Sequence, residues 1–417
     1  MNTNARSLAF ESLKKCTKDG KYSNLEVLSS LSRVNLDPRD KALYTALVYG
    51  VIEKGITLDH VLSDYSRIPL EDLDVGALVS LRLGLYQILF MDRVPDHSAC
   101  DEAVKLVPKS AKSFVNGVLR AILREKDEVI KSIETAPLSV KYSVPQWMIS
   151  IWQDGYGEEK TLEILKGFES RPPMTLRVNT LKTTADELLC HIDGKPHPIH
   201  SDMIYAAGNA EGLYGYAEGL FFVQGTNSRT AVKALGLQAG ETVIDTCACP
   251  GGKSFSAAID MKNQGRIYSF DLHSNKLSLI TRGAKRLGID IITADTCNAA
   301  SPCEELLGSA DAVICDVPCS GLGIIAKKPD IKYKNYSDVE RLPKIQAEIL
   351  SASSGYLKSG GRLLYSTCTL NPEENERITE EFLKEHKNFR RAEGCPVTAF
   401  PSDDSDDGFF YDLLIKD

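Results

Sequence analysis

Residues 245–253 read Asp245-Thr246-Cys247-Ala248-Cys249-Pro250-Gly251-Gly252-Lys253. The apolar pair Val243-Ile244 precedes this stretch, and a helical pattern follows it. A strand, a tight glycine turn and a helix in this order are typical of a parallel α/β sheet. Such sheets bind nucleotide-like ligands beyond the carboxyl ends of their strands. The stretch therefore predicts an α/β domain with a cofactor loop at residues 245–253.

The pattern around this loop alternates between strands and helices from about residue 227 onward. The strand candidates are apolar runs, most of which end in a polar residue: 243–245, 267–271, 291–295, 312–316 and 363–365. Helical segments of about 10–15 residues separate most of them, which predicts a doubly wound parallel sheet. A last strand is expected at residues 408–415.

Two common nucleotide motifs do not fit the loop. A Walker A loop needs a glycine where this chain has Cys247, although Gly252-Lys253-Ser254 matches its end. The spacing Gly-x-Gly-x-x-Gly of dinucleotide-binding folds is absent from the loop. Both ATP and NAD are therefore disfavoured.

Acidic residues that end successive strands favour S-adenosylmethionine instead. Asp271 can bind the two ribose hydroxyls of a nucleoside, and Asp295 is placed to meet an adenine amino group. Asp316 ends the following strand, and the glycines of the loop let the backbone approach a methionine moiety. Each aspartate could instead cap a helix N-terminus without touching a ligand.

Two cysteines stand in short polar motifs directly after strands. Cys319 lies in Asp316-Val317-Pro318-Cys319-Ser320-Gly321, and Cys368 lies in Ser366-Thr367-Cys368-Thr369. Because the carboxyl ends of parallel strands meet at one edge of a sheet, both thiols could face the same substrate. A lone cysteine is usually a small buried hydrophobic residue, but this reading fits these two positions poorly.

A thiol beside a methyl donor points to cytosine chemistry. Carbon C5 of cytosine is a poor nucleophile, and a thiolate that adds to C6 makes C5 enamine-like and able to accept a methyl group. The thiolate needs nearby positive charge, which Lys253 can supply. A carboxyl group such as Asp316 can bind N3 or N4 of the base and carry the proton that addition requires.

Composition limits the class of protein. The 417 residues are 43% hydrophobic and 25% charged, with a formal net charge of −8, which argues mildly against a nucleic-acid partner. Eleven cysteines without a secretion signal favour a reducing cytoplasm. No apolar run is long enough to span a membrane, and the absence of paired Cys-x-x-Cys motifs argues against a metal site. We expect a monomer.

The first half of the chain has a different character. Apolar residues at helical spacing predict an all-helical N-terminal third, with helices at 5–16, 38–53, 57–66, 70–91, 100–107 and 110–124. From about Pro137 a small α+β module follows, with a strand over 172–179 and another over 220–223.

Taken together, these motifs resemble the RNA cytosine-C5 methyltransferases of the Nol1/Nop2/Sun type. The two cysteine motifs, the loop 245–253, the segment 172–179 and the tail 407–411 all carry the likeness. Residues 114–120 (Phe-Val-Asn-Gly-Val-Leu-Arg) and 86–89 (Tyr-Gln-Ile-Leu) are similar to NusB-like helical domains. That combination resembles the bacterial RsmB/Sun subgroup, which methylates 16S ribosomal RNA.

The resemblance implies three domains. These are a NusB-like helical RNA-binding domain at residues 1–136, linker helices with a small ferredoxin-like or RRM-like substrate module at 137–226, and a Rossmann-like S-adenosylmethionine-dependent methyltransferase domain at 227–417. The implied partner is 16S ribosomal RNA, free or in early assembly.

The resemblance also implies roles for individual residues. Cys368 would be the nucleophile and Cys319 would assist product release, with Asp316 and Lys253 as further catalytic residues. The cofactor residues would be Cys247, Ala248, Cys249, Pro250, Gly251, Gly252, Lys253, Asp271, Asp295 and Asp316.

Three features stand apart from the family pattern or extend it. Cys249 replaces the usual alanine, and residues 224–229 (Gln-Gly-Thr-Asn-Ser-Arg) differ from the usual sequence of that loop. A basic segment follows the first cysteine motif and could line an RNA path, or it could be a solvated surface. Its residues are Lys327, Lys328, Lys332, Lys334, Arg341 and Lys344.

Two functions are alternatives to methylation of 16S ribosomal RNA. One is methylation of transfer RNA, and the other is a non-catalytic role as an RNA-binding factor in ribosome assembly.

Overall fold

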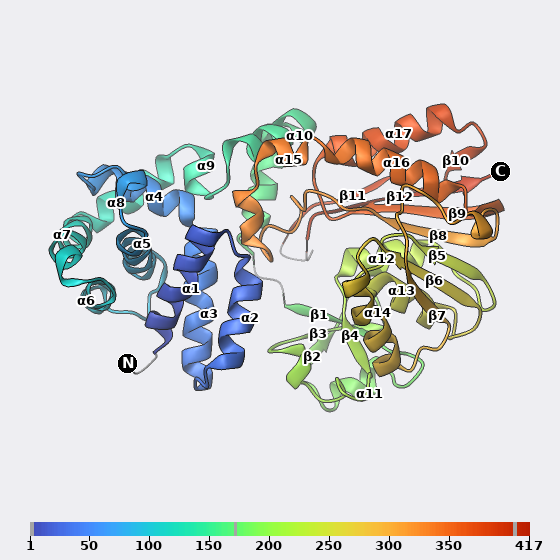
Figure 1. Ribbon diagram of the computed structural model, residues 1–417, viewed down its shortest axis with the longest axis horizontal. Helices are drawn as coiled ribbons and strands as arrows, with labels where there is room; N and C mark the ends of the chain where they lie inside the picture. Colours follow the sequence, from blue (N-terminus) through green and yellow to red (C-terminus); the bar gives the residue numbers. More distant parts are fainter. Residues whose placement is uncertain (1–3, 171–172, 403–406) are drawn as a thin grey trace. The chain divides into compact units, whose positions relative to one another are not determined.

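The protein is described from a computed structural model, in which residues 4–170, 173–402 and 407–417 are described (Figure 1). The chain divides into two compact units. The first comprises Met1–Asp154 and Ile325–Lys334, and the second comprises Gly155–Ile324 and Asn335–Asp417. Within the described residues, no helix combines the length and the apolar character needed to cross a membrane.

The first unit is all-helical, as predicted. Its elements are α1 (Ala5–Asp19), α2 (Ser23–Arg33), α3 (Pro38–Glu53), α4 (Gly55–Tyr65), η1 (Leu70–Asp72), α5 (Val75–Phe90), α6 (Asp96–Leu106), α7 (Lys109–Arg124), α8 (Lys126–Thr135), α9 (Leu138–Lys141) and the start of α10 (Gln146–Gly167). Asp37 and Asp74 begin α3 and α5 by accepting hydrogen bonds from backbone N–H groups of the first turn.

Helix α5 is the centre of this unit. It is apolar on nearly all sides, and it packs against α1, α3, α4, α6 and α7. A helix that is hydrophobic all round must be surrounded by other elements. Close packing against α3 requires Gly50, because a Cβ atom there would meet the ring of Tyr86.

A short segment beyond the Pro-Cys motif also belongs to the helical unit. It contains the 3₁₀ helix η4 (Pro329–Tyr333). Asp330 accepts hydrogen bonds from the backbone nitrogen and the hydroxyl of Ser23, at 2.9 and 2.5 Å. The Tyr333 hydroxyl donates to the carbonyl oxygen of Ile52 (2.8 Å). These contacts anchor residues 325–334 to α2 and α3.

The second unit begins with a small antiparallel sheet of order β2-β3-β1-β4. Its elements are β1 (Met174–Val178), α11 (Ala185–Leu189), β2 (Gly194–Pro196), β3 (Met203–Ala206), η2 (Ala210–Gly212) and β4 (Phe221–Val223). One face carries Leu176, Val178 and Phe221 and packs on α11. The opposite face carries Arg177 and Phe222, which contact the larger domain that follows. Both faces of the sheet are therefore covered.

The larger domain has a sheet of order β10-β12-β9-β8-β5-β6-β7. Its strands are β5 (Thr242–Asp245), β6 (Arg266–Asp271), β7 (Ile292–Thr296), β8 (Ala310–Asp316), β9 (Leu357–Thr367), β10 (Phe389–Arg391), β11 (Val397–Ala399) and β12 (Phe409–Lys416). Its helical elements are α12 (Thr226–Ala234), α13 (Gly252–Asp260), α14 (Ser274–Leu287), η3 (Glu304–Leu306), α15 (Tyr336–Val339), α16 (Leu342–Ser354), η5 (Pro372–Glu374) and α17 (Glu376–Glu385).

Helices cover both faces of this sheet. Helices α12, α13 and α14 lie on one side of the sheet, and α16 and α17 lie on the other (Figure 1). Val243 and Leu364 pack with the first group of helices, whereas Ile244 and Leu363 pack with the second. The apolar runs of the sequence reflect this double burial, because a strand buried on both faces has no polar alternation.

The five strands predicted to be parallel are parallel, whereas the strands at one edge of the sheet are not. Strand β12 is antiparallel to both β9 and β10, although the order β9-β8-β5-β6-β7 is parallel. Helix α17 carries the chain to β10, two positions beyond β9. The chain then returns through β11 without another helix, and a connection without a crossover helix produces an antiparallel neighbour.

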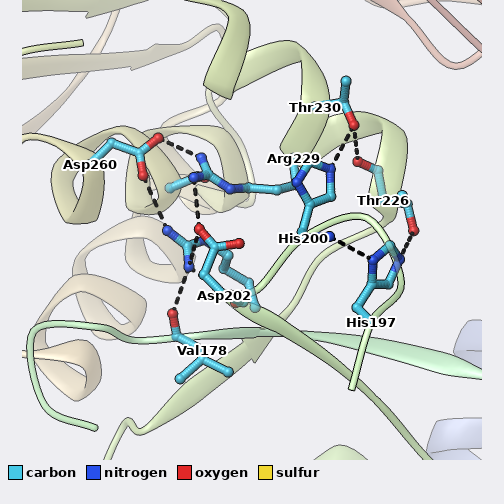
Figure 2. A network of polar contacts seen from close by, with 10 residues as sticks. Val178, His197, His200, Asp202, Thr226, Arg229, Thr230 and Asp260 are labelled. Atoms are coloured by element: carbon cyan, nitrogen blue, oxygen red, sulfur yellow. Dashed lines mark hydrogen bonds and ion pairs between the residues drawn. The ribbon is translucent and has the colours of Figure 1, made fainter. Parts of the chain in front are cut away.

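Two buried arginines and two partly buried aspartates join the small sheet to the larger domain (Figure 2). Arg177 of β1 contacts Asp202 at 3.0 Å and Asp260 at 3.1 Å. Arg229 of α12 contacts Asp202 at 2.8 Å and also pairs with Asp260. Burial, together with the neighbouring Arg229, lowers the pKa of Arg177 to about 10. Each charge has two opposite partners, which offsets the cost of removing it from water.

Two histidines lie beside this cluster (Figure 2). His200 Nε2 donates to Thr230 Oγ1 (2.8 Å), because the Thr230 hydroxyl itself donates to the carbonyl oxygen of Thr226. This leaves His200 Nδ1 buried and without a hydrogen-bond partner among the described residues. Burial lowers the pKa of His200 to about 4, although Asp202 acts in the opposite direction.

We predict that Arg177→Met lowers the free energy of unfolding by about 3 kcal/mol, because two partly buried carboxylates then share one arginine. The matched control is Arg390→Met, which removes an exposed ion pair with Asp417 and should change the free energy by less than about 1 kcal/mol. Denaturant unfolding of the second unit measures both variants. Equal effects of the two substitutions would contradict the assignment.

We also predict an acid-sensitive contribution from His200. Its pKa is lower in the folded than in the unfolded chain, so its contribution is complete above about pH 6.5 and is lost as the pH falls toward 4. Between pH 7 and 5 the loss should be about 2 kcal/mol. His200→Gln, which keeps a donor for Thr230, should flatten this part of the profile. An unchanged slope in that variant would refute the prediction.

Candidate active site

The predicted cofactor loop connects β5 to α13. Gly251 adopts a φ of +113°, and a side chain at this position would also collide with the ring of Phe255. Helix α13 begins at Gly252, so the first backbone N–H groups of the helix lack partners within it. The glycine turn thus presents a helix N-terminus beside the loop, an arrangement suited to a negatively charged or polar ligand group.

A pocket of about 540 Å³ opens beside this loop. Its lining residues are Val223, Gln224, Gly225, Ser228, Asp245, Cys247, Ala248, Cys249, Pro250, Gly252, Lys253 and Asp316. The structure therefore brings seven of the ten predicted cofactor residues to one cavity. Gly251, Asp271 and Asp295 are not among the lining residues.

The two aspartates outside the lining have local partners. Asp271 Oδ1 accepts a hydrogen bond from the backbone nitrogen of His273 (2.9 Å), just before α14. Asp295 Oδ1 accepts from the backbone nitrogen of Thr296 (2.7 Å). Neither contact caps a helix, because the N-cap of α14 is His273, which lacks a side-chain cap, and Asp295 lies within β7. A ligand role for either residue stays a prediction.

Five lining residues did not figure among the predicted site residues: Val223, Gln224, Gly225, Ser228 and Asp245. Asp245 ends β5, and Gln224 and Ser228 come from the loop before α12 and its first turn. Gln224 donates to the carbonyl oxygen of Gly252 (3.2 Å), so the loop that differs from the family pattern is anchored to the start of α13. The position of Asp245, directly at a strand end, was a signal that the sequence offered for it.

Asp245 is a buried acid with an incomplete set of partners. Its Oδ2 accepts a hydrogen bond from the Ser254 hydroxyl (2.6 Å), whereas its Oδ1 has no partner among the described residues. Burial raises the pKa of Asp245 to about 7, and the negative charge of Asp316 adds to this rise. A buried acid with a displaced pKa in a pocket is a common mark of a functional site.

Lys253 and Asp316 form an ion pair across the pocket. Their side chains meet at 2.7 Å, and the Lys253 ammonium also lies 5.3 Å from the centre of the Phe409 ring. Asp316 accepts a further hydrogen bond from the Ser366 hydroxyl (2.7 Å). Asp316 therefore connects the pocket to the strand that leads into the second cysteine motif.

The two predicted cysteines lie side by side. Cys319 Sγ and Cys368 Sγ are 3.3 Å apart, and both residues are partly buried. Strands β8 and β9 are parallel neighbours, and Asp316 pairs with Ser366, so the two loops leave the sheet at the same level. The backbone nitrogen of Gly323 also donates to the carbonyl oxygen of Cys368 (3.0 Å).

Cys319 is a thiol with a displaced pKa. The hydrogen bond with Cys368, followed by burial, raises the pKa of Cys319 well above its usual value. The negative charge of Glu374 acts in the same direction. These causes favour the protonated form of Cys319, although either sulfur can donate in the contact between the two residues.

The basic segment after the first cysteine motif is divided by the fold. Lys332 donates to the carbonyl oxygen of Glu53 (2.9 Å), so its ammonium group contributes to packing inside the helical unit. An RNA contact by Lys327, Lys328, Lys334, Arg341 or Lys344 stays a prediction.

Comparison with known proteins decides the family. The model of the 16S rRNA methyltransferase RsmB/F family matches residues 232–415, that of the NusB family matches residues 3–124, and that of the RsmF/B-like ferredoxin-like domain matches residues 144–202. The chain belongs to the RsmB/F family of 16S rRNA methyltransferases. This membership confirms the resemblance and the three predicted fold types.

Full-length relatives agree with this membership. The chain is 37% identical to the probable ribosomal RNA small subunit methyltransferase B of Bacillus subtilis, over 93% of this chain and 90% of that protein. It is 32% identical to the ribosomal RNA small subunit methyltransferase B of Klebsiella pneumoniae, over 100% and 99%.

Solved structures share the fold. The crystal structure of PH0851 covers 100% of both chains with 25% identity and a TM-score of 0.80. The structure of NSun6 from Pyrococcus horikoshii with SFG covers 65% of this chain and 98% of that chain, with 20% identity and a TM-score of 0.58. At 20% identity, the likeness to NSun6 shows a shared fold only.

We predict that Asp245→Asn stabilises the protein at alkaline pH. The folded-state pKa of Asp245 is raised, so its ionisation costs stability as the pH rises from about 4 through 7. The gain in the free energy of unfolding should be at least about 1 kcal/mol larger at pH 8 than at pH 5.

Asp311→Asn is the control with the opposite sign. Although burial acts to raise it, the hydrogen bond from Lys358 holds the pKa of Asp311 below its usual value, so this variant should lose stability at pH 8. Thermal unfolding of both variants between pH 5 and 8 measures the difference. A destabilised Asp245→Asn at pH 8 would contradict the buried-acid interpretation.

Proposed function

We propose that this chain transfers a methyl group from S-adenosylmethionine to C5 of a cytosine in 16S ribosomal RNA, with Cys368 as the covalent nucleophile. The observation that carries the proposal is the contact between Cys319 Sγ and Cys368 Sγ at 3.3 Å. Beside this pair lies a pocket that contains an acid–base pair, Lys253 and Asp316.

The pocket residues suit the proposed cofactor. Asp245 Oδ1 and Gln224 Oε1 are buried acceptors without partners among the described residues, and both residues line the pocket. An ammonium or hydroxyl group of a ligand would satisfy them, since buried acceptors need donors. Bound there, S-adenosylmethionine would supply an electrophilic methyl group. Asp271 and Asp295 would hold its nucleoside from the neighbouring strand ends.

Cys368 suits the role of nucleophile better than Cys319 does. The thiolate is the attacking species, and Cys319 is held in the protonated form by its hydrogen bond with Cys368 and by burial. The same hydrogen bond stabilises negative charge on Cys368 Sγ. The Cys368 thiolate adds to C6 of cytosine, which breaks the aromaticity of the ring and activates C5.

Asp316 and Lys253 would bind and polarise the cytosine ring. Asp316 can accept a hydrogen bond from N4 or share a proton with N3, which withdraws electrons from the ring as sulfur adds to C6. Lys253, paired with Asp316 at 2.7 Å, fixes the orientation of the carboxyl group and provides positive charge near the developing anion.

Cys319 would assist the release of the product. Once Cys368 is bonded to C6, it is no longer an anion, and the largest cause that holds the proton on Cys319 is removed. Cys319 can then lose its proton to solvent, and its thiolate takes the C5 hydrogen as a proton. The electrons of that C–H bond restore the double bond, and Cys368 leaves as a thiolate.

The RNA would be bound by several parts of the chain. C5 and C6 lie inside a stacked helix, so the target cytosine must turn out of its stack to meet Cys368. Shape and phosphate contacts would come from three domains, which we propose to lie at residues 1–136, 137–226 and 227–417. The full-length relatives act on small-subunit ribosomal RNA, as their names state, and this favours 16S RNA over transfer RNA.

We predict that Cys368→Ala abolishes turnover and that Cys319→Ala accumulates a covalent protein–RNA adduct. The reason is that the first variant cannot form the C6 bond, and the second cannot complete its elimination. The measurement is methyl transfer from labelled S-adenosylmethionine to protein-free 16S RNA, with transfer RNA alongside, followed by denaturing gels for the adduct.

Cys100→Ala is the control, since this buried cysteine belongs to the core of the helical unit and is not one of the proposed site residues. An adduct in Cys368→Ala but not in Cys319→Ala would reverse the two roles. Labelled transfer RNA without labelled 16S RNA would favour the alternative substrate. Cofactor binding without label in either RNA would favour a non-catalytic assembly factor.

A further inference from the structure

Glu374 is a fully buried acid immediately beyond the second cysteine motif. It ends the 3₁₀ helix η5, and its side chain has no exposed surface. No lysine or arginine among the described residues lies within ion-pair distance of it. A buried acid without a cationic partner is costly unless several donors surround it.

The donors around Glu374 come from both cysteine loops. Its Oε2 accepts from the backbone nitrogen of Ser320 (2.8 Å) and from Gln346 Nε2 (2.9 Å). Its Oε1 accepts from the Ser320 hydroxyl (2.5 Å) and from Asn371 Nδ2 (3.1 Å), and the Thr369 hydroxyl lies 3.4 Å from the same oxygen. Ser320 directly follows Cys319, and Thr369 directly follows Cys368.

The two residues that follow the cysteines also contact each other. Ser320 Oγ and Thr369 Oγ1 are 2.6 Å apart. Because a hydroxyl carries a single proton, the consistent arrangement is that Thr369 donates to Ser320 and Ser320 donates to Glu374. Gln346 adds a third connection, since its Nε2 also donates to the carbonyl oxygen of Pro318 (2.9 Å). One carboxylate thus holds the residues on either side of Cys319 and the residue after Cys368.

We propose that Glu374 is a positioning residue that fixes the Cys319 and Cys368 loops against each other. It contacts neither the proposed substrate nor the pocket, so it acts through the two thiols. The effect of Glu374 on catalysis rests on the roles proposed above for those cysteines. A shorter side chain could not reach both loops, and an amide would present an N–H group to donors that need an acceptor.

The carboxylate also acts through its charge. After the hydrogen bond with Cys368 and burial, the charge of Glu374 is among the causes that raise the pKa of Cys319. A neutral residue at position 374 should therefore let Cys319 ionise at lower pH. A purely mechanical support would not produce this change, so the pH profile of Cys319 separates the two descriptions.

The test compares Glu374→Gln and Glu374→Asp with the control Glu373→Gln, which affects an exposed neighbour paired with Arg377. We expect Glu374→Gln to lower kcat about 100-fold, since a displacement of about 1 Å can have that effect. KM for S-adenosylmethionine should not change. Alkylation of Cys319 by iodoacetamide, followed by peptide mass spectrometry without RNA, should shift to lower pH in Glu374→Gln but not in Glu373→Gln.

Glu374→Asp separates geometry from charge. It keeps the charge but shortens the side chain, so kcat should fall while the alkylation profile of Cys319 stays near that of the wild type. If Glu374→Gln does not fold, the kcat of Glu374→Asp still tests the proposal. Wild-type kcat in either folded Glu374 variant would overturn the proposal, as would equal losses of kcat and cofactor binding.

The two proposals fail in different ways. If the wild-type protein methylates no RNA, the proposed function fails. The alkylation profiles still test the link between Glu374 and Cys319, because they need neither RNA nor cofactor. An unchanged profile in folded Glu374→Gln, together with an active wild type, rejects the positioning role alone.

Discussion

The parallel pairing of β8 with β9 is the constraint on which the candidate site depends. Asp316 is level with Ser366 in this pair, so the two cysteine motifs emerge together although 49 residues separate the cysteines. A slip of one residue would turn alternate side chains to the opposite face of the sheet. The thiol contact, the hydrogen bond between Ser366 and Asp316, and the connections of Glu374 all require this register.

Local pattern and motif predicted much of this arrangement. The five strands expected from apolar runs coincide with β5–β9, and the alternation with helices gave the correct layers. The sequence missed α2 and α8, in each of which a single apolar residue, Val27 or Val129, is buried. It also missed the insertion of β12 between β9 and β10, because strand order depends on pairing partners that are far apart in the chain.

The buried charges show why pattern alone is insufficient. Arg177 stands in an apolar strand, where sequence suggests either a surface residue or an error in the strand assignment. Its partners Asp202 and Asp260 lie 25 and 83 residues further along the chain, and only the folded structure brings them together. Once this cluster forms, the second face of the small sheet is closed. That sheet therefore cannot expose a surface for stacking bases in the manner of an RRM domain.

The acidic residues of the candidate site have different partners from the two aspartates that pair with Arg177 and Arg229. Asp202 and Asp260 are each paired with two arginines, so their charges stabilise the contact between the small sheet and the larger domain. Asp245 and Glu374 are buried, and neither forms an ion pair with a lysine or arginine in the described part of the chain; their side chains accept hydrogen bonds instead. Evolution could have relieved that cost with a nearby lysine or a neutral residue. Asp245 beside the pocket and Glu374 beside the two thiols therefore lower the stability of the fold. This cost is accepted at positions where the orientation and charge of the acid contribute to the proposed reaction.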